Sequence, residues 1–221
     1  MKLAFYIHIP YCSKRCGYCD FNTYTPSELR AGVDSVASVS EGYIDGLIRE
    51  LEHAASGLNT RRVSTIFFGG GTPTLLPADQ LARVLKSIEA RFEVTEDCEI
   101  TTEANPDSVN KASLTQLREV GFNRISFGVQ SIKSHVLQVL DRTHDSARVG
   151  EVVHSAKSAG FDSISVDLIY GTPGESITDF AESVDFALSL PIDHISAYAL
   201  IVEQGTKFGA AVRRGRLRSA V

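Results

Sequence analysis

The sequence predicts an α/β protein in which six strands alternate with helices. Short apolar runs recur along the chain, and segments with apolar residues at helical spacing separate them. Such alternation requires right-handed crossovers and therefore a parallel sheet. The residues suited to chemistry follow successive strands, at the strand ends where active sites of (β/α) barrels lie. An open doubly wound sheet gives a similar pattern, so the pattern alone leaves barrel and open sheet as alternatives.

The predicted strands are short runs of mainly apolar residues. They cover residues 3–9, 63–68, 98–102, 125–129, 164–170 and 194–200. Cys98 lies in the third of these runs. Because free cysteine commonly serves as a small core residue, we expect Cys98 to be buried and not to be a ligand.

The predicted helices carry apolar residues three and four positions apart. They cover residues 43–55, 77–88, 111–120, 146–159 and 180–188. Pro77 opens the second helix, and Gly121 ends the third, as proline and glycine often do at those positions. A long loop precedes the first helix.

Composition indicates one domain and a protein free in solution. The 221 residues are 43% hydrophobic, and no polar or proline-rich linker divides them. The formal net charge of −5 argues against broad binding to nucleic acid. No apolar run reaches membrane-spanning length, and Met1 leads directly into the first strand without room for a signal peptide. We therefore expect a cytoplasmic protein without a membrane span.

Cys12, Cys16 and Cys19 stand in eight residues directly after the first strand. Iron–sulfur clusters usually take four cysteines, so a cluster held by three has one iron open to another ligand. Structural zinc needs four protein ligands, and the only extra donors here are His8 and the distant Cys98. A disulfide framework needs an oxidising compartment and a dispersed, even set of cysteines. The spacing therefore favours an iron–sulfur cluster in a reduced compartment.

Cys-x3-Cys-x2-Cys resembles the motif of the radical S-adenosylmethionine (SAM) enzymes. The segments from Tyr6 to Cys12 and from Cys19 to Phe21 are similar to the HemN/HemW branch of that family, and the similarity extends to about Thr206. The resemblance implies a partial (β/α)6 barrel, TIM-barrel-like and open at one side. It also implies a [4Fe-4S] cluster on the three cysteines and SAM as a second cofactor.

The resemblance carries SAM-contact roles onto eight residues, each in a recognisable local motif. They are Tyr6, Gly70, Gly71, Thr72, Glu103, Gln130, Arg142 and Asp167. Glycines without a Cβ let the backbone approach a ligand, and the fork of an arginine can hold a carboxylate in two hydrogen bonds. A glutamate can accept from the SAM ammonium, although a helix cap is an alternative role for Glu103. Asp167 lies inside an apolar strand and therefore needs hydrogen-bond partners. Tyr18 is a candidate adenine contact, and His8 a candidate contact of the cluster or of SAM.

Two departures from the oxidase pattern separate members of the branch. Anaerobic coproporphyrinogen oxidases carry a further cysteine shortly after the third and an arm before the first strand. Here Asp20 and Phe21 follow Cys19, and five residues precede Tyr6. The chain therefore looks like the haem-chaperone members, which implies that it binds haem and hands it to an acceptor protein, with a flavodoxin or ferredoxin as a possible reductant. Two alternatives stay open: an oxygen-independent coproporphyrinogen III oxidase and a non-catalytic iron–sulfur electron-transfer module.

Family members continue with a C-terminal domain. We therefore expect residues 1–205 to be the radical SAM core domain and residues 206–221 to be a basic tail that begins a missing domain. From Gly205 onward the sequence shows no strand and no apolar face. The basic residues of this tail are Lys207, Arg213, Arg214, Arg216 and Arg218. The open side of the barrel should then expose apolar surface.

Overall fold

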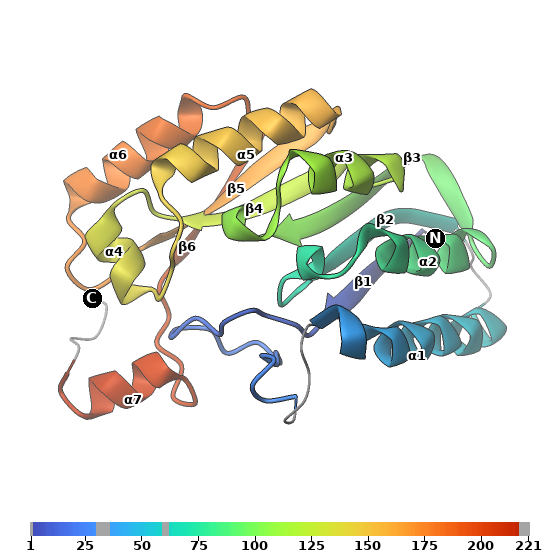
Figure 1. The fold of residues 1–221 in the computed structure, drawn as a ribbon, viewed down its shortest axis with the longest axis horizontal. Helices are drawn as coiled ribbons and strands as arrows, with labels where there is room; N and C mark the ends of the chain where they lie inside the picture. The colour runs from blue at the N-terminus through green and yellow to red at the C-terminus, as the bar shows by residue number, and fades with distance from the viewer. Residues whose placement is uncertain (1, 30–35, 59–61, 217–221) are drawn as a thin grey trace.

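Six parallel strands form one sheet in the computed structural model, which describes residues 2–29, 36–58 and 62–216. The strands are β1 (Leu3–Ile9), β2 (Arg62–Gly70), β3 (Glu93–Ala104), β4 (Arg124–Gln130), β5 (Ser163–Tyr170) and β6 (His194–Ala199). Their order in the sheet is their order along the chain, and every neighbouring pair is parallel. Within the described residues β1 and β6 each pair on one side only. The sheet is therefore an open, partial barrel, as predicted (Figure 1).

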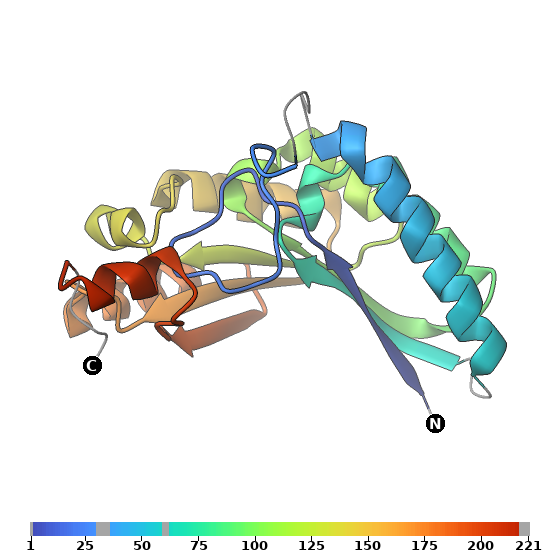
Figure 2. The same ribbon diagram turned by 90° about the horizontal axis from the view of Figure 1, so that it is seen from below.

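The connections between strands are helical. The helices are α1 (Val36–Gly57), α2 (Ala78–Glu89), α3 (Lys111–Glu119), α4 (Ser134–Val139), α5 (Ser146–Ala159), α6 (Ile177–Leu188) and α7 (Lys207–Arg213), with short 3-10 turns η1 (Pro73–Leu75) and η2 (Pro106–Ser108). Helices α1, α2, α3 and α5 cover one face of the sheet (Figure 2). No helix in the described ranges combines the length and the apolar character needed to cross a bilayer.

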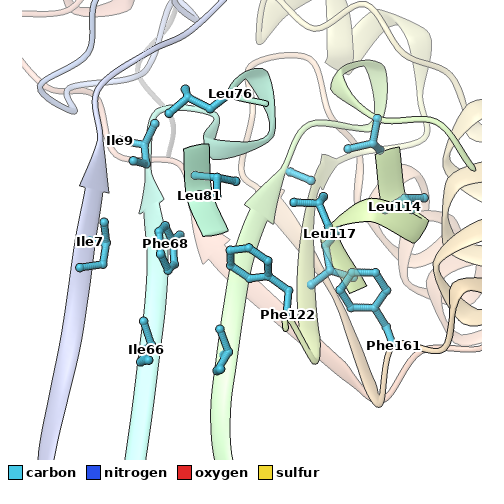
Figure 3. Packing of buried hydrophobic residues seen from close by; sticks show 14 of the residues in the cluster. Ile7, Ile9, Ile66, Phe68, Leu76, Leu81, Leu114, Leu117, Phe122 and Phe161 are labelled. Carbon is cyan, nitrogen blue, oxygen red and sulfur yellow. The ribbon is translucent and has the colours of Figure 1, made fainter. Parts of the chain in front are cut away.

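The main core fills the space between the sheet and these helices. Side chains of the strands, such as Ile66 and Phe68 of β2, meet Leu81 of α2 and Leu114 of α3 in one buried cluster (Figure 3). Phe68 and Phe122 pack edge to face with ring centroids 5.1 Å apart. Burying this apolar surface fixes the register of the parallel strands, because a slip would expose it. Cys98 is buried in the same cluster, as predicted.

Two predicted elements are longer in the structure than their apolar patterns. Helix α1 begins at Val36, where the pattern indicated residue 43, because Ser40 is buried and its hydroxyl donates to Gln80 Oε1 at 2.5 Å. Strand β3 begins at Glu93, five residues before the predicted start at Cys98. Its polar first half pairs with the start of β2 across a register shift. Polar contacts and backbone pairing extend both elements beyond their apolar faces.

The segment after Gly205 corrects a prediction. It forms helix α7, whose N-cap is Thr206; the Thr206 hydroxyl accepts a hydrogen bond from the backbone N–H of Gly209 at 3.0 Å. The helix has an apolar face, because Phe208 is buried and Val212 packs against the same small cluster. Phe208 among basic neighbours was too weak a pattern to predict this helix and its apolar face from the sequence. Residues 217–221 of the predicted tail, including Arg218, lie outside the described residues.

Candidate functional site

A cavity of about 410 Å³ lies at the C-terminal ends of the strands. Parallel strands bring their carboxyl ends to one edge, so segments far apart in sequence meet there. Ten of the predicted site residues line this cavity: Cys12, Cys16, Cys19, Gly70, Gly71, Thr72, Glu103, Gln130, Arg142 and Asp167. Tyr6 is not among the lining residues.

The loop after β1 holds the three cysteines in place through backbone hydrogen bonds. The Cys12 N–H donates to the carbonyl of Tyr24 at 3.1 Å, and the Cys19 N–H donates to the carbonyl of Cys16 at 3.2 Å. The Thr72 hydroxyl lies 4.0 Å from Cys12 Sγ and donates to it. Burial raises the pKa of the Cys12 and Cys19 thiols, so a metal that binds them as thiolates would release protons.

The three thiols line one cavity. In the part of the chain that the structure describes, no three His, Cys, Asp or Glu side chains converge on the position of a single metal ion. A [4Fe-4S] cluster binds each thiolate at a different iron, so it does not require three thiols to meet at one point. The donor set, three cysteines at one wall of a cavity, fits a cluster with one iron that lacks a protein ligand.

The glycines at the end of β2 are required by the close approach of the end of β1 and the loop that follows it. A Cβ on Gly71 would lie 2.4 Å from the carbonyl oxygen of Tyr11 and 2.8 Å from that of Ile9. Gly70 has a φ of 105° and leaves room for the ring of His8, which a Cβ would meet at 2.4 Å. These glycines line the cavity, but their close approach is to the end of β1 and to Tyr11 at the start of the cysteine loop. The motif therefore joins the second strand to that loop.

Arg142 carries a positive charge into the cavity. Its Nη1 donates to Cys16 Sγ at 3.6 Å, and its Nη2 donates to the carbonyl of Gly128. Its Nε is buried and has no hydrogen-bond partner among the described residues. An unsatisfied buried donor is costly, so this guanidinium suits an anionic group of a ligand.

Two carboxyl groups line the same cavity. Glu103 Oε2 accepts from the backbone N–H of Gly70 at 3.1 Å. Burial, with the charge of Asp167 as a further cause, raises the pKa of Glu103 to about 7. Burial also raises the pKa of Asp167, which accepts from the Ser126 hydroxyl at 3.1 Å and 3.2 Å through its two oxygens. A ligand with both a cationic and an anionic group would find a partner for each here.

Gln130 ends β4 with an uncommon backbone. Its φ is 65°, in the left-handed region that non-glycine residues rarely occupy, and the β4–β5 register shifts between Gly128 and Gln130. The buried His144 supports this end of β4, because its Nε2 donates to the carbonyl of Val129 at 2.8 Å. Its other ring nitrogen has no partner among the described residues. Burial and the nearby charge of Arg142 lower the pKa of His144 to about 4, so the ring is neutral near pH 7.

Tyr6 and His8 lie beside the cavity lining. The Tyr6 side chain is 60% exposed, and its hydroxyl lies 3.3 Å from His8 Nδ1. His8 Nε2 lies 2.8 Å from the carbonyl of Asn22, to which it donates. Both ring nitrogens of His8 are therefore satisfied by protein groups, and the ring ties β1 to the cysteine loop. A role of Tyr6 in binding SAM stays a prediction.

Several lining residues lie at the end of β6 or directly after it and were not predicted as site residues. They are Tyr198, Ala199, Leu200, Ile201 and Glu203. Their position at the end of a strand in a parallel sheet is a signal that could have found them, because strand ends share one edge. No recognisable motif marks them. Tyr18 also lines the cavity, and burial raises the pKa of its hydroxyl; its contact with adenine stays a prediction.

Curated relatives align with this chain over nearly its whole length. The haem chaperone HemW of Mycobacterium tuberculosis (strain H37Rv) is 45% identical over 212 residues, which are 96% of this chain and 53% of the relative. HemW of Bacillus subtilis (strain 168) is 37% identical over 218 residues, covering 98% of this chain and 55% of the relative. The chain thus spans about half the length of the curated relatives it matches.

A solved structure has the same fold. Coproporphyrinogen III oxidase (HemN) from Escherichia coli, a radical SAM enzyme, superimposes with a TM-score of 0.83 at 32% identity. The match covers 99% of this chain and 49% of that protein. The model of the Radical SAM superfamily matches residues 6–187. Since that range includes all three clustered cysteines and most of the cavity, the chain belongs to the radical SAM superfamily.

Proposed function

We propose that this chain is the cluster- and SAM-binding core of a HemW-like haem chaperone, which binds haem and transfers it to an acceptor protein. The observation that carries the proposal is the 45% identity to a HemW over 96% of this chain. Clustered thiols point to a compartment that keeps them reduced, so we place the protein in the cytoplasm. A flavodoxin or ferredoxin is the kind of protein that would reduce its cluster.

The cavity supplies the groups that these two cofactors need. Cys12, Cys16 and Cys19 would hold a [4Fe-4S] cluster, which when bound offers an open iron to chelate SAM and an electron to reduce it. Arg142 offers its unpartnered Nε to the SAM carboxylate, and Glu103 offers a carboxylate to the ammonium. The remaining proposed SAM contacts are Tyr6, Gly70, Gly71, Thr72, Gln130 and Asp167.

An oxygen-independent coproporphyrinogen III oxidase is the second candidate, because the E. coli HemN structure matches the fold at 32% identity. Against it stands the sequence after the cluster motif. Asp20 and Phe21 occupy the positions where the oxidases of this branch carry a further cysteine. A non-catalytic electron-transfer module is the third candidate, and it has no need of the charged groups at the cavity.

Cluster binding is tested on protein purified and reconstituted without oxygen. We expect about four irons per chain with matching acid-labile sulfide, as this cluster type implies. Cys16→Ala should abolish the cluster, whereas Cys98→Ala, at the buried cysteine of β3, should retain it. Stoichiometric zinc without sulfide, or equal loss of iron in both variants, would contradict the ligand assignment.

Reaction class is tested on the reconstituted protein with SAM and a reductant. The chaperone proposal expects haem binding and no conversion of coproporphyrinogen III to protoporphyrinogen IX. Appearance of the doubly decarboxylated product would select the oxidase. Absence of both SAM binding and haem binding, with an intact cluster, would select the electron-transfer module.

A further inference from the structure

Helix α7 lies against the cysteine loop, although about 190 residues separate them in sequence (Figure 2). The backbone N–H of Phe208 donates to the carbonyl of Gly17 at 2.8 Å. Gly17 lies between Cys16 and Cys19, the two cysteines that are closest in sequence. The first turn of α7 therefore contacts the short turn between Cys16 and Cys19, two of the proposed cluster ligands.

The Phe208 side chain reinforces this contact. It is 3% exposed and belongs to a small apolar cluster with residues of α4, β5 and the end of β6. Tyr18, the neighbour of Gly17, packs against the same cluster. The backbone bond and the apolar contact thus act on adjacent residues of one turn. Gly17 itself lacks a side chain, so only such external contacts limit its conformations.

One carboxylate joins the loop to α7 a second time. Asp141 accepts from Lys14 at 3.3 Å through Oδ1 and from Lys207 at 2.9 Å through Oδ2. A Cβ on Gly17 would lie 3.0 Å from Asp141 Oδ2, so this carboxylate lies directly beside the turn. The next residue, Arg142, donates to Cys16 Sγ. Asp141 therefore contacts both the cysteine loop and α7, and it is the sequence neighbour of Arg142.

We propose that the first turn of α7 is a clamp for the cluster loop, with Lys207 and Phe208 as positioning residues that act through Asp141 and Gly17. Within the described residues the turn has one internal backbone bond, from the Cys19 N–H to the Cys16 carbonyl. The clamp supplies the contacts that keep it in one conformation, which a site needs in order to bind its metal without reorganising. The working core then extends beyond the predicted boundary at residue 205. The role of this clamp in cluster binding rests on the proposed function, whereas the contacts of Lys207 and Phe208 with Asp141 and Gly17 do not depend on it.

The clamp is tested first on metal-free protein, by hydrogen exchange of the peptide that contains residues 12–19. Lys207→Ala removes one ion pair to Asp141, and we expect about two- to fivefold faster exchange there, as for loss of one exposed pair. Asp141→Ala removes both pairs and should have the larger effect. Lys207→Arg keeps the charge and should restore slow exchange. Arg214→Ala, which removes a positive charge at the other end of α7, is the matched control and should leave the peptide unchanged.

The second test uses reconstituted protein and a property of the cluster. We expect Asp141→Ala and Lys207→Ala to change the midpoint potential and the paramagnetic resonance signal of the reduced cluster, and Arg214→Ala to change neither. The clamp proposal would be overturned if Asp141→Ala and Lys207→Ala both showed the same hydrogen exchange of the loop and the same cluster signal as Arg214→Ala. Failure of the unmodified chain to bind a cluster would overturn the proposed function instead, while loop exchange would still decide whether the clamp exists.

Discussion

Arg142 shows how one residue joins a proposed cluster ligand to the rest of the cavity. Its guanidinium contacts Cys16 Sγ and the Gly128 carbonyl, and its Nε remains without a partner among the described residues. Glu103 faces the same cavity with a carboxyl that burial keeps partly protonated near pH 7. Both residues are predictable from motifs. Their protonation and their unused hydrogen-bonding capacity are not, because these depend on burial created by distant strands.

Arg142→Ala should weaken SAM binding about 10- to 150-fold. A charge-assisted hydrogen bond contributes roughly 1.5–3 kcal/mol, and the substitution removes at least one from the SAM carboxylate. Calorimetry on reconstituted protein measures the affinity, and the variant should still bind its cluster. Arg118→Ala, on α3 where the arginine bonds the carbonyl of Gly160 at 2.7 Å, is the control. Equal SAM affinity in the two variants would count against this carboxylate site.

Glu103 should make the stability of the metal-free protein depend on pH. Its pKa rises from an ordinary value of 4.5 to about 7 in the folded state, mainly through burial. Between these values the folded protein holds a proton that the unfolded chain has released, so stability falls as pH rises through this window. Each pKa unit corresponds to about 1.4 kcal/mol, so the loss approaches about 3 kcal/mol above pH 7.

Urea unfolding at pH 5 and pH 8 measures this effect. Glu103→Gln removes the titration while its amide oxygen can still accept from the Gly70 N–H. The difference in unfolding free energy between the variant and the unmodified chain should therefore favour the variant more at pH 8 than at pH 5. A difference that does not change with pH would show that Glu103 titrates normally in the fold.

Among the elements, the glycine turn after β2 has the strictest steric requirement. The backbone N–H of Gly71 donates to the Ile9 carbonyl at 2.8 Å, and that of Thr72 donates to the Tyr11 carbonyl at 2.7 Å. The turn thus continues the β1–β2 pairing beyond the strands and reaches the residue before Cys12. The sequence predicted this turn and its place at the cavity. It could not show that the glycines serve backbone packing, because that depends on how closely the two loops approach.

Gly71→Ala should destabilise the chain and disturb the cluster loop. The new methyl group would lie 2.4 Å from the Tyr11 carbonyl oxygen, so backbone has to move, and overpacking of this kind costs about 1–3 kcal/mol. Gly42→Ala in α1 is the matched control, since a Cβ there meets nothing within 4 Å and should stabilise the helix by up to about 1 kcal/mol. Thermal unfolding of the two variants should therefore shift in opposite directions. A shift of Gly71→Ala in the same direction as the control would refute the packing account.

Elements with a continuous apolar pattern were predicted closely, and those held by tertiary contacts were not. Helix α5 covers residues 146–159 as predicted, because its apolar face and the capping Asp145 are both local signals. Helices α4 and α7 were missed because each has only six or seven residues and its apolar side chains find partners in one small cluster. Short helices of this kind gain most of their stability from packing, which a local pattern does not reveal.

At the scale of the whole molecule, the sheet ends at β6 with its apolar side chains uncovered. Tyr198 is 58% exposed and Ile201 is 67% exposed, and both line the cavity at this edge. This confirms the predicted exposure of apolar surface at the open side of the barrel. The alternation of strands and helices and the family resemblance together predicted the architecture. In that architecture all the parallel strands end at the same edge. What covers the open side depends on contacts that the described residues do not supply.

The chain alone should bind a cluster and SAM but transfer haem poorly. The cavity walls that carry the cysteines, Arg142 and Glu103 come from β1 to β5 and their loops, whereas the β6 side is exposed. Exposed apolar surface of this kind marks a missing partner or a tendency to aggregate. A full-length relative, such as the M. tuberculosis HemW of which this chain matches 53%, is the comparison. Haem transfer to an apo-acceptor and binding of an apolar fluorescent dye should be measured for both proteins. We expect slower transfer and stronger dye binding for this chain, and equal transfer rates would show that the part absent from this chain is dispensable for haem transfer.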